Sequence, residues 1–341
     1  MLSICMPTYN YAHYIGEALD SCLSQDEDFE LVVFDDASTD NTLEVLDTFR
    51  HDKRLKIVAA GSRIPTQDAF NASVAACSQP WIKMLHADDK LLPGAVGSFK
   101  DMIRADRGVA FHGFLAHMID AHGNTVRRHR PYTPTGETMA LAGDDALRAK
   151  LRQIARFKEP TCNMYRKDAW QAAGGYQKKY PGVFDMQFNV RMMQANRCAL
   201  WSRYLVCVRR HGKSLGATIP KATNLAEMRE FTAEVLAMMG GRATFSDQQY
   251  AQGWIAYRLM ELCGRRALSD AKGTLRMLAE NFQVVTNPLA MLQGVRLAAT
   301  RLFHGDVQQQ GMMTAGYSFQ HLLHEGGNAI RGKLAVGTGA D

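Results

Sequence analysis

The stretch SICMPTYN, residues Ser3–Asn10, begins with a short β-forming run that passes directly into a polar turn. Four more β-rich runs follow, at residues 30–34, 55–60, 81–85 and 109–117. Amphipathic runs with apolar residues at helical spacing lie between them, at residues 15–24, 42–50, 67–76 and 94–104. This alternation predicts an α/β domain with a mostly parallel sheet flanked by helices, an architecture typical of nucleotide-binding domains.

The rest of the chain divides at about residue 212. Before it, mixed patterns predict an α+β continuation of the same domain, with helices at 144–153 and 184–194 and strands at 161–165 and 199–208. After it the strand signals nearly vanish, and helices are predicted at 224–239, 247–262, 270–281 and 288–303. We therefore predict a catalytic domain at residues 1–214 and an α-helical C-terminal region at residues 215–341, frayed from about residue 326.

The composition is that of a soluble globular protein, with 46% hydrophobic and 22% charged residues. The net charge of +6 is spread along the chain, which disfavours a nucleic-acid partner and favours an anionic small substrate or a phospholipid surface. The seven cysteines are scattered without metal-binding spacing and are expected to be reduced core residues. No signal-peptide pattern and no long apolar stretch occurs, so a cytoplasmic protein is expected.

Polar residues follow the first two predicted strands. Open α/β sheets bind ligands beyond the carboxyl ends of their strands. Candidate nucleotide-binding residues are therefore Pro7, Thr8, Tyr9 and Asn10 after the first strand, and Asp35 and Asp36 after the second. Residues 38–41 offer helix-capping oxygens, and Glu44 is placed to close a capping box with Asn41. The two aspartates precede that helix, so they either bind a ribose or base or hold their own turn.

The fourth predicted strand runs into His86-Ala87-Asp88-Asp89. Adjacent carboxylates at a turn point to different sides, so one can bind a divalent cation while the other reaches a ribose. Mg²⁺ and similar ions favour one or two carboxylates together with substrate phosphates. His86 is open to two interpretations, a packed residue or a ligand.

The first-strand segment SICMPTYN, the second-strand segment DDASTD at residues 35–40 and the triplet Ala87-Asp88-Asp89 together resemble the family-2 glycosyltransferases of GT-A fold. The resemblance covers about residues 1–211. It implies that Pro7, Tyr9 and Asp36 surround the base, usually uracil, and that Asp88 faces the ribose. It implies further that Asp89 holds Mg²⁺ or Mn²⁺ on the diphosphate.

The resemblance also implies a general base. Family members commonly carry a Glu-Asp pair at the start of a helix after a Gly-Gly-aromatic turn, and this chain has Gly174-Gly175-Tyr176 followed by Phe184-Asp185. Asp185 takes the catalytic position, and Phe184 replaces the usual Glu, which often shapes the acceptor site. The alternative for Asp185 is an acid favoured by the helix dipole alone.

The segment RRHGKS, residues 209–214, is similar to the Arg-x-His-x-x-Ser segment of relatives. It makes Arg209 and His211 candidates for binding the departing diphosphate. The alternative is a solvated basic loop.

The implied activity is inverting transfer of a sugar from a nucleoside-diphosphate donor, a UDP-sugar by resemblance, to a glycan or lipid-linked acceptor in bacterial surface polysaccharide assembly. Two alternatives stay open, a catalytically inactive sugar-nucleotide-binding module and a nucleotidyltransferase, although the latter normally has a Gly-rich phosphate loop. The helix at residues 288–303 would also suit an anionic membrane surface. A peripheral contact with the inner face of the plasma membrane is therefore a further hypothesis.

Overall fold

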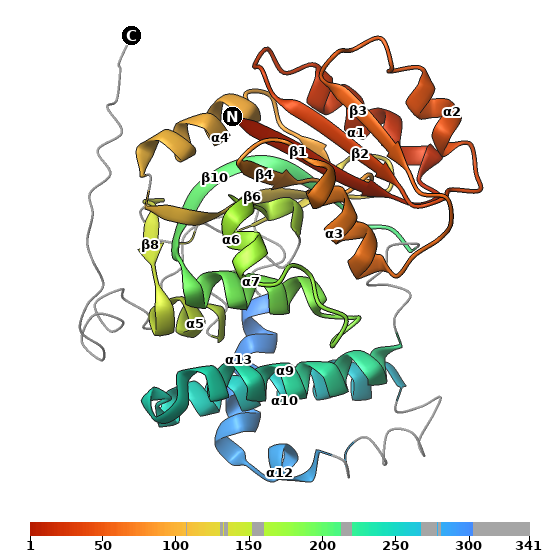
Figure 1. Ribbon diagram of the computed structural model, residues 1–341. Helices are drawn as coiled ribbons and strands as arrows, with labels where there is room; N and C mark the ends of the chain where they lie inside the picture. Colours follow the sequence, from red (N-terminus) through yellow and green to blue (C-terminus); the bar gives the residue numbers. More distant parts are fainter. Residues whose placement is uncertain are drawn as a thin grey trace. The chain divides into compact units, whose positions relative to one another are not determined.

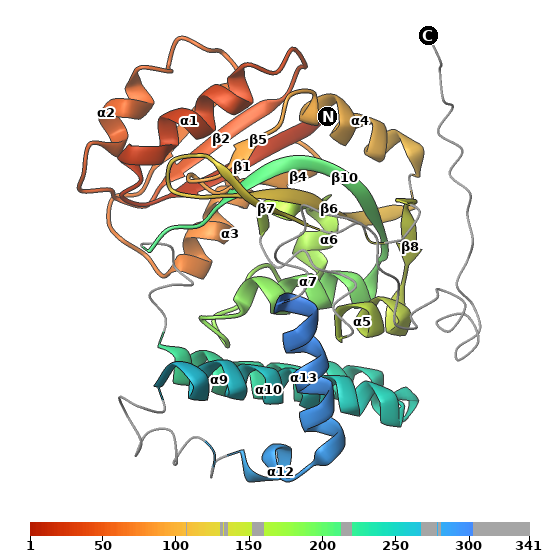
Figure 2. The same ribbon diagram turned by 180° about the vertical axis from the view of Figure 1, so that it is seen from behind.

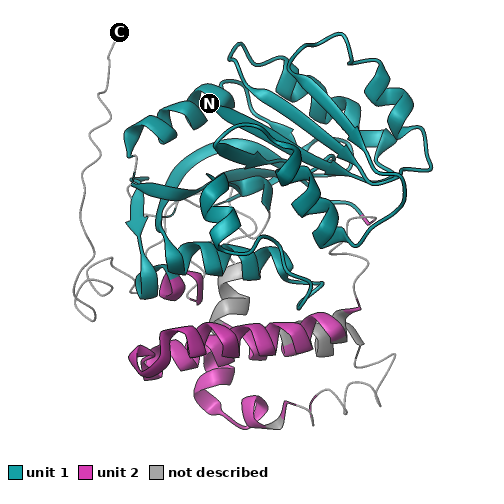
Figure 3. Ribbon diagram, viewed as in Figure 1, with its two compact units in different colours: residues 1–146, 155–211, 323–341 teal, residues 147–154, 212–322 magenta. Residues whose placement is uncertain are grey.

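The computed structural model describes residues 1–106, 108–129, 132, 136–151, 160–212, 220–266, 278 and 281–302. The described residues form two compact units, coloured separately in Figure 3. The first contains residues 1–146 and 155–211 as far as they are described, and the second contains residues 147–154 and 212–322 with the same restriction. The predicted boundary after residue 214 falls outside the described residues, so it stays a prediction.

Four parallel strands form the N-terminal half of the sheet, in the order β3-β2-β1-β4 (Figure 1). Their bounds are β1 Leu2–Thr8, β2 Glu30–Asp35, β3 Leu55–Ala59 and β4 Trp81–Met84. The connecting helices are α1 Ala12–Leu23, α2 Thr42–Asp47 and α3 Thr66–Ala76. β1 is buried along almost its whole length, which explains its continuous apolar run. The predicted strands and helices of this half are confirmed.

The sheet continues through β9, β6, β10 and β5. These strands are β5 Lys90–Leu91, β6 Val109–Ile119, β9 Asn163–Arg166 and β10 Arg197–Arg209. Two further strands lie outside this order: β7 Thr125–Arg128 pairs with β6, and β8 Met139–Leu141 pairs with β10. The strands β1, β2, β3, β4, β6 and β10 point in one direction, whereas β5, β7, β8 and β9 run against it. The described sheet is therefore mostly parallel, as predicted.

Helices cover both faces of this sheet (Figures 1 and 2). α1, α2 and α4 (Ala95–Ala105) lie on one face, where Lys100 of α4 bonds to Glu27 just after α1. α3, α6 (Lys167–Ala172) and α7 (Phe184–Ala195) lie on the other, where Phe70 of α3 packs against Phe184 of α7. A further helix, α5 (Gly143–Leu151), and the 3-10 turn η1 (Pro160–Cys162) follow β8.

The second unit is helical in its described residues. Its elements are α9 Lys221–Met239, the 3-10 turn η2 Gly240–Arg242, α10 Phe245–Arg266, α12 Phe282–Val285 and α13 Pro288–Leu302. These confirm the predicted helices except the one at residues 270–281, which lies almost wholly outside the described residues, as does the predicted fraying from residue 326.

Six cysteines are free and buried, as predicted: Cys5, Cys22, Cys77, Cys162, Cys198 and Cys207. The side chain of Cys263 lies outside the described residues. Within the described parts of the chain, every helix is too short or too polar to cross a membrane.

A buried histidine makes the core sensitive to acid. His112 of β6 accepts a hydrogen bond from the Trp201 indole at 3.0 Å, and burial lowers the pKa of His112 to about 3. In the unfolded chain this imidazole takes up a proton near pH 6.5, whereas in the folded protein it does so only near pH 3. The contribution of neutral His112 to the free energy of unfolding is therefore fully present above pH 6.5 and is lost as the pH falls towards 3. Between pH 7 and pH 5 the wild type should lose about 2 kcal/mol more unfolding free energy than His112→Gln. Urea unfolding of both proteins at the two pH values measures this difference, and equal losses would contradict it.

Candidate active site

The loops after β1, β2 and β4 meet at one edge of the sheet. Thr8 at the end of β1 pairs with Asp35 at the end of β2, and the backbone N–H of Asp36 donates to the Thr8 carbonyl at 2.9 Å. On the other side of β1, the N–H of Leu85 after β4 donates to the Cys5 carbonyl at 2.9 Å. The three predicted motifs therefore lie side by side, because parallel neighbouring strands end at the same edge.

The first two loops are fastened to each other. Asn10 has a positive φ of 58°, and its side-chain oxygen accepts a hydrogen bond from the N–H of Thr39 at 2.7 Å. The carboxylate of Asp35 accepts from the N–H of Ser38 at 3.0 Å and from the Ser38 hydroxyl. Asp35 thus holds its own turn, the structural alternative considered above, and Asn10 joins the two loops. Their predicted contacts with a nucleotide stay predictions.

The predicted capping box at the start of α2 is wrong. Asn41 occupies the cap position but makes no side-chain capping bond. The carboxylate of Asp40 instead accepts from the N–H of Thr42 at 3.0 Å and from the Thr42 hydroxyl. A capping box would need the Asn41 side chain to accept from the N–H of Glu44, and that bond is absent.

Asp36, Tyr9 and Arg63 form a compact group at the mouth of β1 and β2. The Arg63 guanidinium lies over the Tyr9 ring, 4.0 Å from its centroid, and forms an ion pair with Asp36. Asp36 also accepts from the N–H of Ile64 at 2.9 Å. The nearby Thr8 hydroxyl is buried and has no hydrogen-bond partner among the described residues. A ring face, a carboxylate, a guanidinium and a spare hydroxyl suit a flat ligand with hydrogen-bonding edges.

His86, Asp88 and Asp89 form the second group, with one ligand atom from each lying within 4.8 Å of the others. Asp88 pairs with the His211 ring at 2.9 Å, and Asp89 lies 3.6 Å from His86 Nδ1. Asp89 is buried, and this burial, reinforced by the negative charge of Asp88, raises the pKa of Asp89 well above its usual range. A cation would relieve this repulsion. One imidazole with two carboxylates is a donor set that fits Mn²⁺, and its oxygens fit Mg²⁺.

Thr161 bonds to Asp89, and Lys83 in turn bonds to Thr161. The hydroxyl of Thr161 donates to Asp89, and the same oxygen accepts the backbone N–H of His86 at 3.1 Å. The ammonium of Lys83, fully buried between the rings of Phe99 and Phe114, donates to the Thr161 carbonyl at 2.7 Å. Burial lowers the pKa of Lys83 to about 7. Neither residue belongs to a sequence motif. The sequence therefore assigns both to predicted strands and does not identify them as site residues.

Arg209 has structural contacts that the sequence analysis did not predict. Its buried guanidinium donates to the carbonyls of Asp88 at 2.9 Å and Ala121 at 3.0 Å, and to the Glu17 carboxylate at 2.8 Å. Its backbone N–H donates to Asp89 at 2.8 Å. This guanidinium therefore holds the loop that carries Asp88 and Asp89, and its predicted contact with a diphosphate stays a prediction. The following residues 213–214 of the predicted basic segment lie outside the described residues.

Asp185 lies in the first turn of α7, where it is partly exposed and accepts the N–H of Met186 at 2.7 Å. Its neighbour Phe184 is 5% exposed and packs edge-on against Phe70, with ring centroids 5.3 Å apart. The Phe70 ring in turn contacts His86, with centroids 5.7 Å apart. The start of α7 is therefore linked through Phe70 to the cluster of His86, Asp88 and Asp89.

The glycine turn before α7 is fixed to α3. Asn71 of α3 accepts the N–H of Tyr176 and donates to its carbonyl, both at 2.8 Å. Gly175 has a φ of +60°, and a Cβ there would lie 2.6 Å from the Asn71 side-chain oxygen. Only glycine fits this approach, which explains the Gly-Gly-aromatic turn of the motif.

Introducing at position 184 the Glu that the resemblance implies should destabilise the protein. Phe184→Glu would place a carboxylate against the rings of Phe70 and Tyr176, so we expect the unfolding free energy to fall by about 3 kcal/mol. Phe184→Leu keeps the site apolar and should lose less than Phe184→Glu. Chemical denaturation of both variants tests this, and a Glu variant as stable as the Leu variant would contradict the apolar environment.

The chain matches the model of Glycosyl transferase family 2 over residues 3–173. It is 30% identical over 211 residues to a PGL/p-HBAD biosynthesis glycosyltransferase of Mycobacterium bovis (strain BCG / Pasteur 1173P2), covering 60% of this chain and 73% of that protein. It is also 32% identical over 128 residues to the chondroitin synthase of Escherichia coli, but that match covers 37% of this chain and only 18% of the synthase.

Solved structures agree on the fold. S. aureus TarS 1-349 in complex with UDP-GlcNAc has a TM-score of 0.63 at 16% identity, covering 90% of this chain and 93% of that 1-349 chain. The mannosyltransferase PcManGT from Pyrobaculum calidifontis, in complex with GDP-Man and Mn²⁺, has a TM-score of 0.52 at 16% identity, covering 89% of this chain and 87% of that one. The family model, the similar sequences and the similar structures all agree with the strand-end motifs. This chain belongs to glycosyltransferase family 2 and has the GT-A fold.

Proposed function

We propose that the protein transfers a sugar from a UDP-sugar to a glycan or lipid-linked acceptor, with inversion at the anomeric carbon. The observation that carries the proposal is the adjacency of two groups at one sheet edge, Tyr9 with Asp36 and the cluster of His86, Asp88 and Asp89. The first suits a nucleoside and the second suits a diphosphate with its cation. We further propose that residues 1–214 form the catalytic domain and residues 215–341 a helical region.

In this proposal the nucleoside lies against Tyr9. The uracil would stack on the Tyr9 ring, and Asp36 would accept from its N–H, with the Thr8 hydroxyl available as a further partner. Arg63 now covers that ring and must move or contact the base edge when the donor binds. Pro7 at the end of β1 would line the same site, and Asp88 would face the ribose.

The diphosphate would lie over Asp88 and Asp89. Held by Asp89 with Asp88 or His86, a divalent cation would neutralise charge on the departing nucleoside diphosphate. His211, beside Asp88 and next to the Tyr14 ring, would donate to a phosphate oxygen. Arg209 and Thr161 would keep these groups in position through the bonds described above.

Asp185 would act as the general base. It would take the proton from the acceptor hydroxyl as that oxygen attacks the anomeric carbon from the face opposite the diphosphate. The oxygen–carbon bond forms while the carbon–phosphate-oxygen bond breaks, so no covalent enzyme intermediate is required. Phe184 and Phe70 would give this side of the site an apolar wall where relatives commonly have a Glu.

Support for a surface-glycan role comes from the named relatives. One is named for PGL/p-HBAD biosynthesis and the other for chondroitin synthesis, so both names refer to biosynthesis. We propose a bacterial surface glycan as the product, made at the inner face of the plasma membrane.

Nucleotide release tests the function. Purified protein is incubated with Mn²⁺ and a panel of UDP-, GDP- and dTDP-sugars, and release of the nucleoside diphosphate is measured with and without an acceptor extract. We expect slow hydrolysis of one UDP-sugar and faster release when the acceptor is present. Tight binding without release from any donor would support the inactive module, and release of pyrophosphate from a nucleoside triphosphate and a sugar phosphate would support a nucleotidyltransferase.

A further inference from the structure

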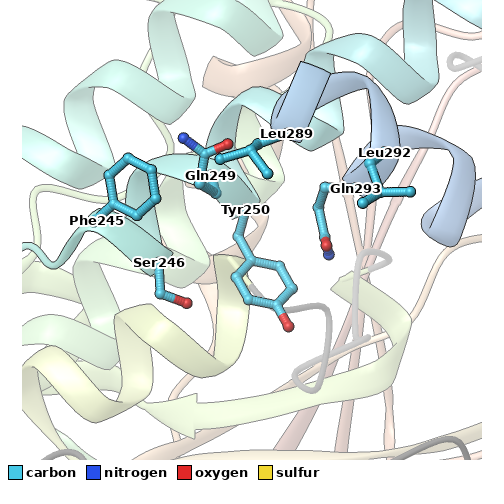
Figure 4. Close-up of a pocket in the computed structure, with 7 residues that line it drawn as sticks. All are labelled: Phe245, Ser246, Gln249, Tyr250, Leu289, Leu292 and Gln293. Atoms are coloured by element: carbon cyan, nitrogen blue, oxygen red, sulfur yellow. The ribbon is translucent and has the colours of Figure 1, made fainter. Parts of the chain in front are cut away.

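The helical unit exposes a set of large apolar side chains on two adjacent helices. Phe245 at the start of α10 is 65% exposed, and Leu289, Leu292 and Val295 of α13 are 48–50% exposed. Phe245, Leu289 and Leu292 also line a cavity of about 360 Å³, together with Tyr250 (Figure 4). We call Phe245, Leu289, Leu292 and Val295 the apolar surface.

This surface is built on a closely packed pair of helices. A Cβ on Gly253 of α10 would lie 2.5 Å from the Gln293 side chain of α13, and one on Gly294 would lie 2.8 Å from Ala256. The two glycines thus permit close approach of the helices. Ala256 and Ala290 are fully buried in the core of the unit. The apolar surface is therefore the outer side of helices whose inner sides are already packed, and its leucines are not needed for that core.

The segment that carries Leu289, Leu292 and Val295 is basic in sequence. Residues 281–305 contain no acidic residue and include Arg296 and Arg301. Arg242, three residues before Phe245, is exposed. The acid nearest to Phe245 in sequence, Asp247, is fully buried and is paired with Arg148 at 3.2 Å. Apolar side chains on a helix with basic and no acidic residues are typical of a helix that lies on an anionic bilayer.

We propose that the apolar surface docks the protein on an anionic lipid bilayer, with Phe245, Leu289, Leu292 and Val295 entering the headgroup and acyl boundary. The long apolar side chains would leave water on binding, and the basic residues of this region would contact acidic headgroups. The docking surface lies in the second unit and does not depend on the proposed sugar transfer. A second copy of this chain could cover the same side chains, and the experiment separates the two occupants.

The test is co-flotation of the full chain with phosphatidylcholine vesicles and with vesicles that also contain phosphatidylglycerol. The wild type should bind the anionic vesicles, with binding weakened by salt. Leu289→Ser/Leu292→Ser should lower the partition coefficient at least about tenfold, given the apolar area removed. Val126→Ser is the matched control, because Val126 is 58% exposed on β7 of the first unit and should bind like the wild type.

Three results would overturn the proposal: no binding of the wild type to anionic vesicles, equal binding of the double variant, or an equal loss in Val126→Ser. A further contradicting result would come from light scattering after size exclusion. If the wild type were a dimer and the double variant a monomer, the surface would be assigned to a second copy. Circular dichroism and donor hydrolysis should be unchanged in the double variant. A failure of the proposed sugar transfer would leave vesicle binding intact, so the two proposals can fail separately.

Discussion

Asp185→Asn should lower the rate of sugar transfer to the acceptor about a thousandfold, while the affinity for UDP stays that of the wild type. The asparagine amide retains the size of the carboxylate and can still accept the backbone N–H of Met186, so the first turn of α7 is preserved. It cannot take a proton from the acceptor hydroxyl. The loss is measured as kcat for acceptor glycosylation, with UDP affinity from isothermal titration calorimetry.

A matched control separates catalysis from the helix dipole. Asp145 is also a partly exposed acid in the first turn of a helix, α5, so Asp145→Asn removes the same charge from the same kind of position. We expect a small change in stability and none in kcat. If Asp185→Asn kept wild-type kcat, or if both variants lost activity equally, Asp185 would not be the base.

The second large effect is expected at Asp89, where activity and stability should change in different directions. Asp89→Asn should abolish metal-supported donor binding and lower turnover by on the order of a thousandfold, because the central carboxylate ligand is lost. Without metal the variant should unfold at the same temperature as the wild type or above it. Burial and the neighbouring Asp88 raise the pKa of Asp89, so the ionised carboxylate is costly in the empty site and a neutral amide removes that cost.

Thermal unfolding without metal and UDP-sugar turnover with Mn²⁺ measure the two effects. The asparagine can accept from Arg209 through its oxygen and donate to Thr161 through its amide, so both supporting contacts can remain. Asp101→Asn, at an exposed position on α4, controls for the change in net charge. A metal-free Asp89→Asn protein that unfolds well below the wild type would show that Asp89 is mainly structural.

The sequence predicted the main strands because each is a run of buried apolar residues long enough to stand out. β1 and β2 are examples, being buried over almost every residue. β5, β7 and β8 were not predicted, since they have two to four residues and show no period. β7 is moreover exposed throughout, so its pairing with β6 leaves no hydrophobic pattern in the sequence.

The candidate site was predictable where it consists of strand-end motifs. Its supporting residues were not. Arg63 reaches Tyr9 and Asp36 from the loop between β3 and α3, and Thr161 reaches Asp89 from η1, so both contacts depend on the folded chain. Arg209 likewise makes contacts that its sequence context does not reveal. An arginine at a strand end looks free to bind phosphate, and only the structure shows that carbonyls and Glu17 occupy its guanidinium.

The central claim is that this sheet edge binds a nucleoside diphosphate together with one divalent cation held by the cluster of His86, Asp88 and Asp89. Electron paramagnetic resonance of free Mn²⁺, titrated with protein in the presence of UDP, measures it most directly. The account predicts one Mn²⁺ bound per wild-type chain, dependent on UDP, and none bound by Asp89→Asn. Wild-type protein that takes up no Mn²⁺ with UDP, or an Asp89→Asn variant that binds it equally, would contradict the account.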